Sequence, residues 1–142
     1  SNFSSILIFI FAVLQTIGAH YTYAEMPLFF YIGDLFDFKR NHYDRVVHFL
    51  FGLLISFPLI EVLLKAGHTR KMAYILTILG LFSCSGFYEL VEWWVTEILH
   101  PEIGVAFLGA QGDVWDAQKD MSLALLGIIL TTGLHLLRYE HE

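Results

Sequence analysis

The sequence predicts an all-α fold: a polytopic transmembrane helical bundle with four membrane-spanning helices and an interfacial segment. Composition is the first reason, because 56% of the 142 residues are hydrophobic and 16% are aromatic, and the mean hydropathy is +0.61. A water-soluble domain of this length leaves too much of its chain exposed to hide so many apolar side chains. The second reason is that these residues gather in four runs, each near the length that crosses a hydrocarbon core of about 30 Å. Lipid offers no partners to backbone polar groups, so each run is expected to be a helix.

The helices are expected within a single integral membrane domain that covers residues 1–142, at about residues 3–20, 44–64, 72–94 and 116–137. The second run contains Pro58, which lacks a backbone N–H and is expected to bend the helix, and Glu61, which is expected to reach Lys65 one turn on. The third run is free of charge up to Glu89, and the apolar part of the fourth directly follows three aspartates. The chain starts with Ser1 rather than Met, so we expect a trimmed N-terminus with further residues upstream.

The connections between the helices differ in character, and this gives the expected orientation. Residues 21–43 are long, aromatic and charged, which is typical of a segment in the membrane interface, whereas residues 65–71 (KAGHTRK) form a short basic turn. All three tryptophans lie near the third connection, as in an aromatic belt at the interface. Because clustered basic residues favour the cytoplasmic face, the basic turn is expected there, with the connections 21–45 and 95–118 on the other face.

Several function classes are excluded by composition and motif. The net charge of −6 argues against a nucleic acid partner, which would need a basic face. Cys84 is the only cysteine, so the chain has neither a disulfide framework nor a CxxC metal motif. Ser83 and Ser85 have no nucleophile elbow around them, and the sequence has no glycine-rich phosphate loop. The spacing Glu89-x-x-Glu92 departs from the Glu-x-x-His pattern of di-iron bundles.

Acidic and imidazole side chains recur at helical spacing near one end of the expected bundle. Asp44 and His48 are four residues apart and therefore share one face of a helix, and the acids of the third and fourth helices repeat in the same way. The order of the crossings brings these groups to the same side of the membrane, together with residues that follow the first helix. The candidate metal-ligating residues are His20, Glu25, Asp44, His48, Glu89, Glu92, Asp113, Asp116 and Asp120.

Carboxylates outnumber basic side chains in this group. Seven of the nine candidates are acids, and Arg40, Arg45 and Lys119 are the basic residues placed to pair with them. Carboxylates crowded in a low dielectric repel one another and lose hydration. Protonation, basic partners or a bound cation would relieve this, and a divalent metal ion is the cofactor that we expect. A mixed carboxylate and imidazole set suits Zn, Mn or Fe, whereas a purely carboxylate subset suits Mg or Ca.

Structural roles for the same residues stay open. Asp113 would serve as a helix N-cap with Asp116 as its capping-box partner, both favoured by the helix dipole, although this leaves Asp120 unexplained. Asp44 would likewise cap a helix, with His48 hydrogen-bonded between helices. The two glutamates of the third helix would reach headgroup water as interfacial acids.

Four segments resemble one family in order and spacing. They are HYTYAEMP (20–27), RNHYDRVVHF (40–49), FYELVEWW (87–94) and FLGAQGDVWDAQKDM (107–121). With these segments the chain looks like a member of the YjdF-like bacterial inner-membrane protein family. The resemblance covers nearly the whole chain and implies a multi-pass protein of the bacterial inner (cytoplasmic) membrane, with further hydrophobic segments upstream. Two upstream crossings after a cytoplasmic N-terminus would also place the basic turn in the cytoplasm. The family has no assigned reaction to transfer.

A more distant resemblance is to VanZ-like membrane proteins, which are associated with glycopeptide resistance. Their pattern is Asp-Lys-x-x-His-Phe, a glutamate on a middle helix, and Asp-x-x-x-Asn at the start of the last helix with a glycine further on. The matching positions here are Asp44, His48, Phe49, Glu89 or Glu92, Asp116 and Gly127. Arg45 replaces the lysine and Asp120 replaces the asparagine, so the site here is more acidic and a VanZ-type role need not carry over.

Two classes of function follow from these patterns. The first is a membrane-embedded site that binds a metal ion and acts on a lipid or another amphiphile at the outer interface, where the metal would activate water or polarise a phosphoryl or carbonyl group. The second is a non-catalytic accessory subunit of a larger membrane complex, in which the polar cluster only locks helices together. An ion or proton pathway is a third interpretation. The expected partners are the lipid bilayer and, for the second class, other membrane subunits.

Overall fold

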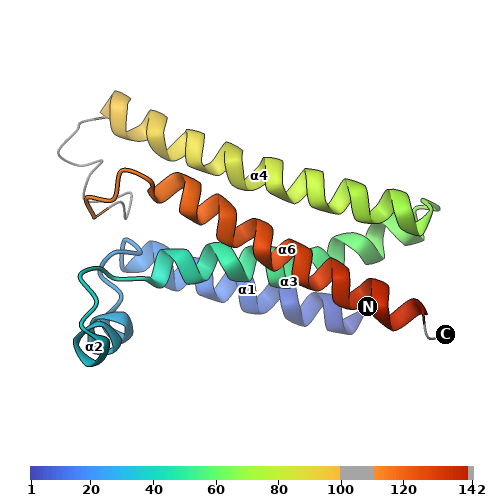
Figure 1. The fold of residues 1–142 in the computed structure, drawn as a ribbon, viewed down its shortest axis with the longest axis horizontal. Coiled ribbons are helices and arrows are strands. Elements are labelled where there is room, and N and C mark those ends of the chain that lie inside the picture. Colours follow the sequence, from blue (N-terminus) through green and yellow to red (C-terminus); the bar gives the residue numbers. More distant parts are fainter. Residues whose placement is uncertain (100–110, 141–142) are drawn as a thin grey trace.

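The structure is a computed structural model that describes residues 1–99 and 111–140. Its helices are α1 (Asn2–His20), α2 (Pro27–Phe36), α3 (Tyr43–Lys65), α4 (Arg70–Leu99) and α6 (Asp116–Glu140), and the described residues contain no strand. All of these helices except α2 are long and apolar enough to cross a membrane. The predicted all-α membrane bundle is therefore confirmed. Figure 1 shows the long helices running lengthwise, with the start of α1 and the end of α6 at one end of the bundle and α2 at the other.

The long helices extend beyond the apolar runs that predict them. α4 has 30 residues, whereas its apolar run predicts a helix over 72–94. At 1.5 Å per residue α4 is about 45 Å long, which exceeds a hydrocarbon core of about 30 Å. Hydropathy marks the part of a helix that lies in lipid, while backbone hydrogen bonding continues the helix into the interface. The glutamates of α4 therefore belong to a continuous helix that reaches the membrane surface.

α3 is the central helix: it packs most extensively against α6 and also contacts α1 and α4. α3 and α6 approach closely at two glycines. A Cβ atom on Gly52 would overlap the carbonyl of Ala124, and one on Gly127 would overlap the backbone of Leu53. Thr131 Oγ1 also donates a hydrogen bond to the Leu53 carbonyl at 2.7 Å. Small residues that let backbones touch are a common means of helix association in lipid. This contact sets the spacing of two helices that carry the candidate site.

The turn after α1 is organised by Tyr23. The chain leaves α1 at His20 and passes through Thr22 and Tyr23 with positive φ angles of 51° and 55°. The Tyr23 ring lies against Gly18, where any Cβ atom would overlap it, and its hydroxyl donates a hydrogen bond to Gln15 Oε1 at 2.6 Å. Left-handed backbone is unfavourable for these residue types, and the ring packing and the hydrogen bond offset that strain. The same contacts fix the side chain of Gln15.

α2 lies within the predicted interfacial segment 21–43. It begins at Pro27, whose ring suits the first turn of a helix, and it is followed by Asp37 in a left-handed conformation with φ 55°. Figure 1 shows its axis crosswise to the long helices. Its exposed apolar side chains are Leu28, Phe30, Tyr31, Leu35 and Phe36. A short helix in this orientation with an exposed apolar surface suits the membrane interface.

Two polar contacts lie toward the end of the bundle that is opposite α2. Glu61 Oε1 is 2.8 Å from Lys65 Nζ, so the predicted pairing one turn apart is confirmed. His135, which has no predicted role, is buried, and its Nδ1 lies 3.0 Å from the Tyr74 hydroxyl. A buried imidazole with such a partner is a normal structural feature of a helix interface.

Candidate functional site

Asn41 and Gln111 tie together the segments that precede α3 and α6. Asn41 is 1% exposed. Its backbone N–H donates to Gln111 Oε1 at 2.8 Å, and Gln111 Nε2 donates to the Asn41 carbonyl at 2.9 Å. The Asn41 side chain accepts from the Tyr43 N–H at 3.1 Å and donates to the Met26 carbonyl at 2.9 Å. These bonds hold the start of α2, the start of α3 and the approach to α6 together. Neither residue is among the sequence-predicted site residues, because neither is ionisable or part of a helical repeat.

An outer ion-pair layer lies at this end of the bundle, and it consists of Arg40, Arg45, Asp113, Asp116 and Lys119. Arg40 pairs with Asp116, and Arg45 Nη2 lies 2.5 Å from Asp113 Oδ2 and 3.2 Å from Asp116 Oδ1. Lys119 Nζ lies 2.6 Å from Asp113 Oδ2. The hydrogen bond from Lys119 is the main reason that the pKa of Asp113 is well below its usual range, and a hydrogen bond from the Trp115 backbone N–H is the next. Two aspartates thus engage all three basic side chains of the layer.

A second group, the inner cluster, consists of Asp44, His48, Glu89 and Asp120. All four residues are buried. One ligand atom from each of Asp44, His48 and Asp120 lies within 4.8 Å of the others. His48 Nε2 is 3.2 Å from Glu89 Oε1 and 3.7 Å from Asp44 Oδ1. Since these residues come from α3, α4 and α6, three helices build one polar centre.

The inner cluster differs from the outer layer in how its charge is compensated. In the parts of the chain that the structure describes, no lysine or arginine forms an ion pair with Asp44, Glu89 or Asp120. Asp120 is 1% exposed, and within the same residues its Oδ1 has no hydrogen-bond partner. Glu89 Oε1 is close to His48 but lacks hydrogen-bond alignment. Taking carboxylates out of water without a counter-charge is costly. The inner cluster therefore has surplus acceptors that a cation or protons would satisfy.

The nine candidate residues fall into different surroundings. Four make up the inner cluster, and the two aspartates of the outer layer are engaged by basic side chains. Glu92 is half-buried, nearly one turn beyond Glu89, and interacts electrostatically with acids of the inner cluster. His20 and Glu25 are exposed, and no contact between described residues joins them to the inner cluster. Metal ligation by any of the nine stays a prediction.

Capping explains part of the acidic pattern. Asp113 Oδ1 accepts a hydrogen bond from the Trp115 N–H at 3.1 Å, just before α6 begins. Asp116 pairs with arginines instead of completing a capping box, because a guanidinium is a stronger partner for a carboxylate than a neutral N–H. The N-cap of α3 is His42, so capping does not account for Asp44, which is buried within the first turn.

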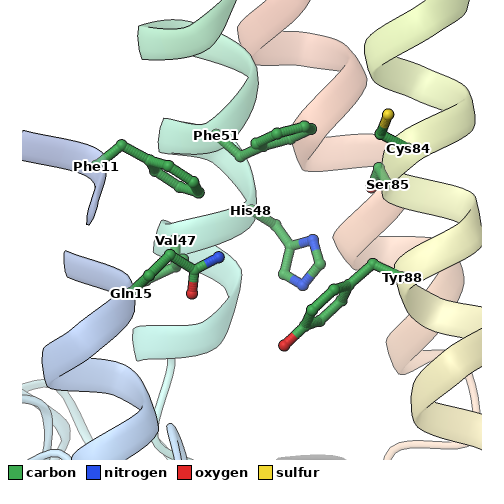
Figure 2. A pocket seen from close by; sticks show the side chains of 8 residues that line it. All are labelled: Phe11, Gln15, Val47, His48, Phe51, Cys84, Ser85 and Tyr88. Carbon is green, nitrogen blue, oxygen red and sulfur yellow. The ribbon is translucent and has the colours of Figure 1, made fainter. Parts of the chain in front are cut away.

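A cavity of about 190 Å³ lies beside the inner cluster, between α1, α3 and α4. His48 belongs to both, because its ring forms part of the cavity wall. Figure 2 shows this ring between Gln15 of α1 and Tyr88 of α4, with Phe51 above it on α3. The inner cluster is thus next to a space that a small part of another molecule could occupy.

Comparison with known proteins gives the family. Residues 1–141 match the family model described as "Predicted membrane protein (DUF2238)". The chain belongs to this family. It is also similar to "Inner membrane protein YjdF" of Escherichia coli (strain K12), with 38% identity over 136 residues that cover 94% of this chain and 64% of the relative. The chain therefore spans slightly less than two thirds of that relative's length. No solved structure matches the chain.

These comparisons confirm the predicted YjdF-like family and the membrane class. The relative's name places that relative in an inner membrane, and the four long apolar helices here fit a multi-pass membrane protein. The more distant similarity to VanZ-like proteins is not shown by these findings and stays a prediction. The orientation of the basic turn toward the cytoplasm also stays a prediction.

Proposed function

We propose that the inner cluster binds a divalent metal ion and that the protein is a membrane-embedded enzyme acting on a lipid or another amphiphile at the outer membrane interface. Asp120 carries the proposal: its carboxylate is buried beside Asp44 and His48, with an oxygen that no described residue satisfies. A buried carboxylate in this state costs several kcal/mol unless it is neutralised. A bound cation would neutralise it without any change of fold.

The donor atoms suit a first-row transition metal. Two ligands that each lie about 2.0–2.2 Å from the same ion are at most about 4.4 Å apart. The donor atoms of Asp44, His48 and Asp120 lie within 4.8 Å of one another, so small side-chain rotations would bring them onto one ion. An imidazole among the ligands favours Zn, Mn or Fe over Mg and Ca. Three protein ligands would leave one position open, as in catalytic zinc sites.

The chain's own residues would divide the remaining tasks. A divalent ion, when bound, activates water or polarises a phosphoryl or carbonyl group. Glu89 Oε1 lies 3.2 Å from His48 Nε2, so this carboxylate is within the cluster and would accept a proton. The surrounding helices keep bulk water from the cluster, which strengthens each electrostatic interaction in it. The inner-membrane location of the E. coli relative supports a lipid or lipid-linked substrate.

Metal analysis and thermal unfolding in detergent test this proposal. The parent protein is expected to carry one divalent ion per chain, and a chelator is expected to lower its melting temperature, because the binding energy of the ion adds to the folding energy. Asp120→Asn should remove both the metal and the response to chelator. Asp34→Asn, at an exposed position on α2, is the matched control and should leave both unchanged. A parent that carries no metal and ignores chelator would end the proposal.

The outer ion-pair layer favours a second candidate, a non-catalytic accessory subunit of a membrane complex. Its ion pairs join Arg40, just before α3, and Arg45, in the first turn of α3, to the start of α6, as a structural lock would. In that case chelator has no effect, and Asp116→Asn melts lower than the parent because its arginine partners lose a carboxylate. A proton pathway, the third candidate, would instead give proton uptake by the inner cluster without stoichiometric metal.

A further inference from the structure

The cavity beside the inner cluster is open to the side of the bundle. α3 packs against both α1 and α4, whereas α1 and α4 make no extensive contact with each other in the described residues. Figure 2 shows Phe11 of α1 on one side of the cavity and Ser85 and Tyr88 of α4 on the other, with His48 of α3 between them. Cys84 and Tyr88 are exposed although they line the cavity. The cavity therefore communicates with the surroundings between α1 and α4.

The surroundings at this depth are hydrocarbon. Phe11 is the central residue of the span Asn2–His20, and Cys84 is the central residue of the span Arg70–Ile98. Central residues of membrane-spanning helices lie near the middle of a hydrocarbon core that is about 30 Å thick. An opening at this depth faces acyl chains rather than water. Lipid chains are therefore the molecules that can enter the cavity from the side.

The cavity wall changes from apolar to polar toward the candidate site. The layer at mid-membrane depth contains Phe11, Phe51 and Cys84, and the buried hydroxyl of Ser85 follows one residue nearer the candidate site. The layer about one helical turn nearer the candidate site contains Gln15, His48 and Tyr88, together with the apolar Val47. The chain runs toward the site along α1 and α4 and away from it along α3. On each of these three helices, the polar residue of the second layer therefore lies nearer the site than the residue of the first layer. Such a wall matches an amphiphile with its chain toward the bilayer centre and its polar end toward His48.

We propose that one alkyl chain of a lipid or single-chain amphiphile enters between α1 and α4 and occupies this cavity, with its polar end at His48. This inference rests on the proposed function and specifies its substrate as a molecule that reaches the inner cluster sideways from the bilayer. The cavity of about 190 Å³ has room for part of a chain, since an apolar cavity of about 150 Å³ takes up benzene. No lining residue carries a fixed charge, which suits an alkyl chain.

Photo-crosslinking in lipid nanodiscs tests the inference. One probe is palmitic acid with a diazirine at a mid-chain carbon, and the second is phosphatidylglycerol that carries the same photoreactive chain. After irradiation, peptides that contain Phe11, Phe51 and Cys84 should be labelled well above the exposed lipid-facing Leu79. Labelling by only the first probe would indicate a free single-chain amphiphile, and labelling by the second a diacyl lipid. Labelling no stronger in the cavity than at Leu79 would overturn the inference.

Two substitutions identify the cavity as the labelled place. Cys84→Phe fills it and should lower cavity labelling about tenfold, the factor given by about 1.4 kcal/mol of lost binding free energy. Phe11→Trp fills it from the other side and should act in the same direction. Ser83→Phe adds the same bulk at an exposed neighbouring position outside the cavity and should not change labelling. Equal labelling of all these variants, each shown to be folded by its melting temperature, would contradict the inference.

Asp120→Asn separates this inference from the proposed metal site. That variant should lose metal and keep cavity labelling, because Asp120 does not line the cavity. Labelling without metal in the parent would support chain binding and end the metal proposal. Metal without labelling would support the metal site and end the inference about the alkyl chain.

Discussion

The outer ion-pair layer and the inner cluster both gather carboxylates at the same end of the bundle, but their charges are balanced differently. In the outer layer two aspartates meet three basic side chains in direct ion pairs. In the inner cluster three carboxylates share one imidazole. Burial favours ion pairs that are complete and penalises charges that are not. The carboxylates of the outer layer therefore already have basic partners, whereas those of the inner cluster need a counter-charge or protons.

Removing a base from the outer layer should have the largest effect. Arg45→Met leaves Asp113 and Asp116 with fewer counter-charges, and it should be the most destabilising variant because the buried Asp116 carboxylate loses one of its two arginine partners. Chemical unfolding in detergent measures the loss. Lys65→Met, which removes an exposed pair with Glu61, is the control and should lower the stability much less, because exposed ion pairs contribute little. Equal losses for the two variants would show that the outer layer is not a buried network.

Separating α3 from α6 should damage both regions together. Gly52→Val forces a side chain into the Ala124 backbone, and overpacking of this kind costs about 1–3 kcal/mol. Because Asp44 and Asp120 lie on the two helices that would be pushed apart, the response to chelator should also weaken. Gly80→Val has open space around it and should be close to neutral. The measurement is the melting temperature of each variant with and without chelator. A tolerated Gly52→Val would refute the close contact.

Two substitutions of the same kind, one in each region, should act in opposite directions. Asp116→Asn removes a charge that arginines bind and should cost about 1–3 kcal/mol. Asp120→Asn removes a charge that no described residue satisfies, so in metal-free protein it should cost nothing or stabilise the fold. Thermal scans of both variants in chelator give the comparison. If Asp120→Asn melts as low as Asp116→Asn, the inner cluster is compensated after all.

The smallest expected effect is a pH dependence that comes from Asp113. Its pKa is held well below the usual range, first by the hydrogen bond from Lys119. A carboxyl group with a lowered pKa in the folded state stabilises the fold above its unfolded pKa of about 4, and this contribution is lost as the pH falls further. The melting temperature of Asp113→Asn should therefore lie below that of the parent at pH 6, with a difference that shrinks below pH about 4. A difference that grows on acidification would contradict the assignment.

The fold was predictable because each long helix coincides with an apolar run. Only the ends were misplaced, as for α4, which continues to Leu99 after its apolar run ends near Trp94. Helix spacing, together with the order of the crossings, also indicated that Asp44, His48 and Asp120 lie at one end of the bundle. It could not show which acids pair with bases, because Arg45 is adjacent to Asp44 in sequence but binds Asp113 and Asp116 in space.

Other parts of the site had no signal in the sequence. Asn41 and Gln111 are held by hydrogen bonds between segments far apart in the chain, and neither residue type marks a motif. The cavity depends on the gap between α1 and α4, which is a property of packing and not of spacing within one helix. A phenylalanine that lines a cavity and one that faces lipid look alike in a sequence.

The contact between Gly52 and the α6 backbone also limits how well the inner cluster can be tuned. Asp120 lies seven residues before Gly127, about 10 Å along α6 from the crossing point. A tilt of about 5° at that fulcrum would displace Asp120 by about 1 Å, whereas metal–ligand distances tolerate only about 0.2 Å. Because the backbones of α3 and α6 are in direct contact at this crossing, the angle between the two helices can change very little. The geometry that the inner cluster would offer to the proposed ion is thus determined two turns away, at glycines.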